Sequence, residues 1–183
     1  MKGSRLRNRD RYLEEAMLFR DTDLIKVITG VRRCGKSSLL DLIRMTIESE
    51  GVAGRGFVSV NLESKGTGIK TEDQLYDYVR GRLSDKGRTY VFIDEPQRID
   101  GWQDAVNAMR VDFDCDIYLT GSNAYLLSSE LATYLSGRYV EVKMLPLSFS
   151  EFADFCGIEF VSGTSVALTP EGNPVLFDDM LTR

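Results

Sequence analysis

The sequence predicts an α/β protein built on a parallel β-sheet, and three observations support this. Apolar β-type runs alternate with amphipathic helical stretches along most of the 183 residues. The run from Tyr90 to Ile93 is continuously apolar, which is typical of a strand buried on both faces of a parallel sheet. The pattern G-x-x-x-x-G-K-S at residues 30–37 lies between one such strand and a helix.

The elements are expected in the order β-α-β-α-β-α-β-α-β. Strands are predicted at residues 24–29, 56–62, 89–93, 116–120 and 139–143. The first helix covers 36–50, where Leu39, Leu40, Ile43 and Ile47 recur at helical spacing. Three later helices are expected to begin at capping residues, namely Thr71 with Gln74, Asp100, and Ser148 with Glu151.

The pattern weakens after residue 156. Residues 166–168 and the turn 170–174 predict half of a hairpin, and Asp178 and Asp179 could open a helix that has no room to continue. We therefore expect three parts: a basic helical segment at 1–20, a core at 21–156, and the start of a C-terminal extension at 157–183.

Composition excludes several function classes. The chain has no histidine, which excludes Ser-His-Asp catalysis and His-ligated zinc. Its three cysteines form no C-x-x-C pair. No apolar run approaches the roughly 20 residues of a membrane span, so we expect a cytoplasmic protein without membrane contact. The net charge of −5 makes the chain a poor nucleic-acid surface, despite the arginine cluster Arg5, Arg7, Arg9 and Arg11.

The glycine-rich pattern predicts a phosphate-binding loop. Its backbone N–H groups and the following helix N-terminus can surround a polyphosphate. Lys36 can contact the β- and γ-phosphates, and the Ser37 hydroxyl can ligate Mg²⁺. Residues expected to bind the nucleotide are Gly30, Val31, Arg32, Arg33, Cys34, Gly35, Lys36, Ser37 and Ser38. The positive charges around Cys34 also predict a thiol that reacts faster than Cys115 or Cys156.

A second set of polar residues follows the apolar strand at 89–93. Asp94 is positioned to hold Mg²⁺, and Glu95 to orient an attacking water. Pro96 keeps Glu95 out of the helical region, and Gln97 is a further polar group within reach of the phosphates. These residues predict the catalytic half of the site.

Two further candidates come from the last strands. In Thr120-Gly121-Ser122-Asn123, a small polar residue can contact the γ-phosphate or the water, and Asn123 can equally cap a helix. Arg138 is either a finger that neutralises transition-state charge or a strand-edge arginine paired with an acid.

Together these motifs, closed by Pro146-Leu147-Ser148-Phe149, resemble a family of prokaryotic AAA-type P-loop ATPases over roughly Arg9 to Phe155. The resemblance implies a three-layer, RecA-like core with a five-stranded parallel sheet in the order 5-1-4-3-2. It implies Asn123 as the sensor and Arg138 as the finger. It also implies a C-terminal region beyond this chain, through which nucleic acid could be contacted.

We therefore expect Mg²⁺-dependent ATP hydrolysis coupled to a conformational change. The alternative is a nucleotide-gated switch with negligible turnover. A GTPase is disfavoured because no N-K-x-D element is present. Whether Arg138 would act in its own subunit or across a homo-oligomer interface is left open.

Overall fold

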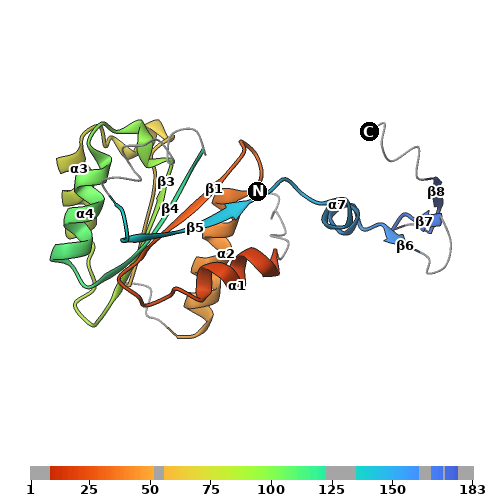
Figure 1. Cartoon of the computed structure of the whole chain (residues 1–183), viewed down its shortest axis with the longest axis horizontal. Coiled ribbons are helices and arrows are strands. Elements are labelled where there is room, and N and C mark those ends of the chain that lie inside the picture. Colours follow the sequence, from red (N-terminus) through yellow and green to blue (C-terminus); the bar gives the residue numbers. More distant parts are fainter. Residues whose placement is uncertain (1–8, 52–55, 123–134, 161–165, 171, 177–183) are drawn as a thin grey trace. The chain divides into compact units, whose positions relative to one another are not determined.

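The computed structural model describes residues 9–51, 56–122, 135–160, 166–170 and 172–176. The chain divides into two compact units, residues 1–144 and 145–183. The first unit ends at Met144 and includes the N-terminal helix α1 (Asp10–Met17) (Figure 1). In the part of the chain that is described, no helix has the length and apolar character needed to cross a bilayer.

The first unit contains a five-stranded sheet. Its strands are β1 (Ile25–Gly30), β2 (Phe57–Asn61), β3 (Thr89–Asp94), β4 (Cys115–Ser122) and β5 (Tyr139–Met144). All neighbouring pairs are parallel and the order is β2-β3-β4-β1-β5. The predicted fold class and strand order are thereby confirmed.

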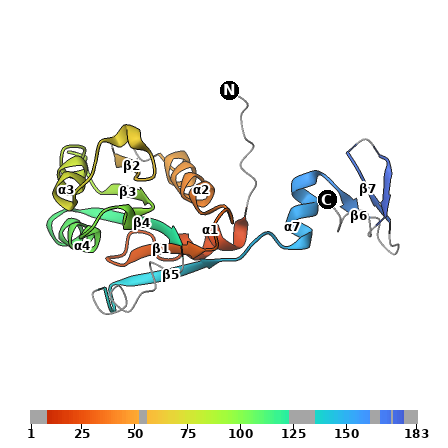
Figure 2. The same ribbon diagram turned by 90° about the horizontal axis from the view of Figure 1, so that it is seen from above.

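Helices cover both faces of this sheet, as Figure 2 shows. On one face, α1 (Asp10–Met17) and α2 (Lys36–Ser49) pack against Ile28, Phe92 and Tyr118. On the other, α3 (Glu72–Arg80) and α4 (Trp102–Asp112) pack against a second core. Successive strand residues point to opposite faces, so two buried faces require the continuous apolar runs seen in the sequence.

The helix starts follow the predicted caps with one exception. The Thr71 hydroxyl accepts from the Gln74 N–H at 3.3 Å, as expected for the start of α3. Asp100 does not cap α4, however. The N-cap is Gly101, which adopts φ +74° after the short 3₁₀ turn η3 (Pro96–Arg98). Glycine adopts this conformation without the steric cost of a Cβ, so the chain turns there instead.

The second unit is a small α+β unit. It contains α7 (Phe149–Cys156) and a sheet of β6 (Glu159–Phe160), β7 (Val166–Leu168) and β8 (Pro174–Leu176). The Ser148–Glu151 capping box is present: Glu151 N–H donates to the Ser148 hydroxyl at 3.2 Å, and Ser148 N–H to the Glu151 carboxylate at 2.7 Å. The predicted hairpin is β7–β8. The expected helix at Asp178 lies outside the described residues.

Candidate functional site

The glycine-rich loop connects the carboxyl end of β1 to the start of α2. Gly30 is required for space, because a Cβ there would lie 2.5 Å from the Met144 carbonyl oxygen on β5. Gly35 caps α2 with φ +97°, a conformation open to glycine. The loop therefore presents the N-terminus of a 14-residue helix, where backbone N–H groups and the helix dipole favour an anion.

Lys36 is held inside this loop. Its Nζ donates to the carbonyl oxygens of Gly30 and Val31, at 3.2 Å each, and the side chain is 6% exposed. These contacts keep the ammonium group at the loop rather than in solvent. A bound phosphate would offer it charged acceptors in place of neutral carbonyls, and such bonds are stronger.

Asp94 lies at the centre of a polar cluster beside the loop. Its carboxylate accepts hydrogen bonds from the Ser37 hydroxyl at 2.8 Å, from the Asn61 amide at 2.9 Å, and from the Thr120 hydroxyl. Ser37 and Asp94 thus bring a hydroxyl and a carboxylate together, and Mg²⁺ prefers such hard oxygen ligands. The residues present fit a magnesium ion, which Ser37 and Asp94 would hold.

Sequence reasoning did not identify Asn61. The sheet register places Asn61 directly opposite Asp94, and Asp94 opposite Thr120. The signal was available in principle, because Asn61 is the last residue of the strand next to β3. The role of Asn61 can be inferred only once the strand order shows that β2 lies next to β3, so that the end of β2 is beside Asp94.

Asp41 lies one helical turn after Ser37 on α2. Burial raises the pKa of its carboxyl, nearby Arg44 opposes this, and the charge of Asp94 adds to the rise. A second carboxylate therefore adds negative potential on the side of Asp94 that faces α2. A cation at Ser37 and Asp94 would relieve this repulsion.

Glu95 has an unusual backbone. It adopts φ +57° and ψ +52°, so it lies outside the right-handed helical region, in the left-handed region rather than the extended one that usually precedes a proline. Its N–H donates to the Thr120 carbonyl oxygen at 3.3 Å, and its carboxylate accepts from the Gln97 amide. For a residue with a Cβ this conformation costs about 1–3 kcal/mol and is concentrated at functional sites.

The loop, the α2 N-terminus and the Glu95 segment surround a cavity of about 800 Å³. Its cationic lining residues are Arg32, Arg33, Lys36 and Arg98, and its acidic ones are Glu63 and Glu95. Arg98 and Glu63 form an ion pair of 3.2 Å between exposed side chains. Gly35, Ser37 and Ser38 also line the cavity. Its size and positive charge fit a polyphosphate-bearing ligand.

Arg138 lies elsewhere in the structure. It immediately precedes β5, and its carbonyl oxygen accepts from the N–H of Ile25, the first residue of β1. The phosphate loop follows the other end of β1, about 17 Å away for five steps of about 3.3 Å along the strand. Its exposed guanidinium donates to the Asn107 side-chain oxygen at 3.1 Å, which is an amide, whereas the strand-edge alternative named an acid as the partner. Asn123 lies outside the described residues.

The exposure of the cysteines argues against the expectation that Cys34 reacts fastest. Cys34 is 6% exposed and belongs to the core between α2 and the sheet, whereas Cys156 is exposed. A reagent must reach a thiol before it can react, so burial opposes the fast labelling that charge alone predicts.

Comparisons with known proteins agree with this geometry. A family described as "AAA domain" matches residues 22–153, which include the loop, Asp94 and Glu95. The chain belongs to the AAA domain family. An uncharacterized protein of Haemophilus influenzae is 48% identical over 147 residues, 79% of this chain and 37% of that protein. An uncharacterized protein of Methanocaldococcus jannaschii is 36% identical over 132 residues, 72% of this chain and 28% of that protein.

Solved structures show the same fold at low identity. A DNA polymerase III gamma subunit-related protein of Thermotoga maritima matches with a TM-score of 0.55 and 14% identity, over 80% of this chain and 49% of that one. Saccharomyces cerevisiae RIF2 also matches at 0.55, with 12% identity over 85% and 64% of the two chains. The AAA domain described here is thus an AAA-type P-loop ATPase domain that spans well under half of its curated relatives' length.

Proposed function

We propose that this domain binds Mg²⁺-ATP in the cavity of about 800 Å³ and hydrolyses the phosphoanhydride bond between the β- and γ-phosphates. The observation that carries the proposal is the convergence of Lys36, Ser37, Asp94 and Glu95 at one edge of the sheet, from three different elements. Family membership supports nucleotide binding at this loop. Adenine is favoured as the base because the sequence has no guanine-reading element.

In the proposed reaction, each residue has a defined task. Lys36 exchanges the Gly30 and Val31 carbonyls for phosphate oxygens. Ser37 and Asp94 would hold Mg²⁺, which supplies charge neutralisation on the phosphates when bound. Glu95 orients the attacking water and accepts its proton, with its carboxylate positioned by Gln97. Asn123 remains the candidate sensor.

Arg138 lies beside the start of β1, whereas the phosphate loop of the same subunit follows the end of β1. Arg138 can therefore act as a finger only at the phosphate loop of a second subunit. We therefore propose a homo-oligomer in which Arg138 of one subunit faces the cavity of the next. Hydrolysis would then be coupled to subunit rearrangement. A cytoplasmic location and contact of the longer protein with nucleic acid through further regions stay proposals.

The competing function is a nucleotide switch with negligible turnover. It is favoured by one observation, namely that the Gln97 amide donates to one oxygen of the Glu95 carboxylate and so competes with water for that oxygen. Phosphate release by the wild-type chain and by Glu95→Gln separates the two. Steady release that is lost in Glu95→Gln, with Mg²⁺-ATP binding kept, supports the ATPase; no release by the wild-type chain supports the switch.

A further inference from the structure

An arginine far from the loop in sequence contacts the loop from outside. The Arg9 guanidinium donates from Nη1 to the Cys34 carbonyl oxygen at 2.9 Å. Cys34 is the residue before Gly35, which lines the phosphate cavity. The contact therefore falls on the peptide group that joins these two residues.

The orientation of that peptide matters for phosphate binding. Described peptide bonds are trans, so the Cys34 carbonyl and the Gly35 N–H lie in one plane and point in opposite directions. While Arg9 holds the carbonyl, the Gly35 N–H must point away from Arg9. A peptide next to a glycine can rotate readily, because glycine tolerates both signs of φ. The Arg9 bond thus selects one of two orientations.

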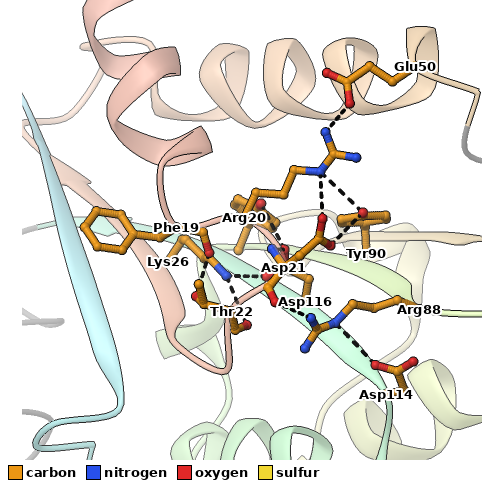
Figure 3. A network of polar contacts seen from close by, with 11 residues as sticks. Phe19, Arg20, Asp21, Thr22, Lys26, Glu50, Arg88, Tyr90, Asp114 and Asp116 are labelled. Atoms are coloured by element: carbon orange, nitrogen blue, oxygen red, sulfur yellow. Dashed lines mark hydrogen bonds and ion pairs between the residues drawn. The ribbon is translucent and has the colours of Figure 1, made fainter.

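Arg9 can do this because its own position is fixed. It precedes α1, and its guanidinium lies 4.5 Å from the centre of the Tyr12 ring, which is buried against α2. The segment after α1 is tied to the sheet by the network in Figure 3. There, the Asp21 N–H donates to the Asp116 carboxylate at 2.8 Å. The Asp21 carboxylate accepts from the Tyr90 hydroxyl, also at 2.8 Å.

We propose that Arg9 is a positioning residue for phosphate binding, which turns the Gly35 N–H toward the phosphates by holding the Cys34 carbonyl. This inference rests on the proposed nucleotide site. Its ligand is the polyphosphate group rather than the base.

The test is calorimetric titration of the full chain with Mg²⁺-ATP and, separately, with Mg²⁺-tripolyphosphate. Arg11→Ala is the matched control, since Arg11 lies two residues after Arg9 in the first turn of α1, is exposed, and lies 5.8 Å from the same Tyr12 ring. We expect Arg9→Ala to weaken both ligands by about threefold to tenfold, the range of one net hydrogen bond, and Arg11→Ala to weaken neither.

Each other outcome overturns the inference. Weaker ATP binding with unchanged tripolyphosphate binding would mean that Arg9 contacts the nucleoside. Equal affinities of Arg9→Ala and Arg11→Ala for the two ligands would mean that the contact of Arg9 with the Cys34 carbonyl does not orient the Gly35 N–H for phosphate binding. A shift in the urea midpoint of Arg9→Ala with unchanged affinity would make its role structural. If Arg9→Ala does not fold, Arg9→Gln, whose shorter side chain falls short of Cys34, is expected to show the same loss. Absence of binding by the wild-type chain would refute the proposed function itself.

Discussion

The buried ion pair between Lys26 and Asp116 predicts a large and asymmetric effect on stability. Both side chains are fully buried where β1 and β4 begin, and Lys26 also reaches the Thr22 carbonyl oxygen at 3.5 Å (Figure 3). Desolvation lowers the pKa of Lys26, and the Asp116 carboxylate opposes this. The other Asp116 oxygen accepts from Asp21 N–H at 2.8 Å and from the Tyr118 hydroxyl at 3.2 Å.

Replacing Lys26 by methionine keeps the apolar stem but leaves a buried carboxylate without its counter-charge. Breaking a buried pair on one side costs about 3–5 kcal/mol, so Lys26→Met should destabilise the first unit by that amount. Lys26→Met combined with Asp116→Asn removes the stranded charge and keeps an acceptor for Asp21 and Tyr118. The double variant should recover more than half of the loss.

Urea unfolding followed by Trp102 fluorescence measures this directly. Trp102 is the chain's single tryptophan, and it is 4% exposed in the core of the first unit. A loss below about 1 kcal/mol for Lys26→Met would refute the reasoning, because the surviving charge would then be solvated or neutral. A double variant no more stable than Lys26→Met would refute it as well.

Three further predictions use other parts of the molecule. A maleimide should label exposed Cys156 before Cys34; faster labelling of Cys34 would show that the loop opens in solution. Burial raises the pKa of Cys115 from 9.0 to about 12, so the unfolded chain loses this proton first and the free energy of unfolding should fall from pH 9 to 12. Cys115→Ala should flatten that decline in urea titrations, and an unchanged slope would contradict the assignment. Arg138→Ala should lower turnover far more than ATP affinity, and mixing it with Glu95→Gln subunits should partly restore phosphate release; no restoration would argue against a finger acting between subunits.

The strands, the α3 cap and the glycine-rich loop could be predicted from the sequence because each depends on residues that are close together in the chain. The continuous apolar strands, the Thr71 cap and the Gly30–Ser37 spacing each act over a few residues, and all three match the structure. The prediction that Asp100 caps α4 was wrong, because an aspartate can cap a helix only where the preceding turn places it at the N-cap position. Here Gly101 takes the turn instead.

Features that depend on long-range placement could not be predicted in the same way. Asn61 reaches Asp94 because β2 and β3 are neighbours in exact register, and Arg9 reaches Cys34 because α1 packs against α2. Cys34 was expected to be reactive from its charged neighbours, but its burial depends on the core beneath the loop. The contacts of Asn61 with Asp94 and of Arg9 with Cys34 join residues that are 33 and 25 positions apart.

The most direct test of the nucleotide site is the affinity of the full chain for Mg²⁺-ATP, compared between wild type and Lys36→Ala. Lys86→Ala is the matched control, because Lys86 is exposed in the turn before β3, at the opposite edge of the sheet. A charge-assisted contact is worth about 1.5–3 kcal/mol, so Lys36→Ala should weaken binding at least about tenfold while Lys86→Ala leaves it unchanged. Equal affinity of wild type and Lys36→Ala would contradict the assignment of this loop as the phosphate site.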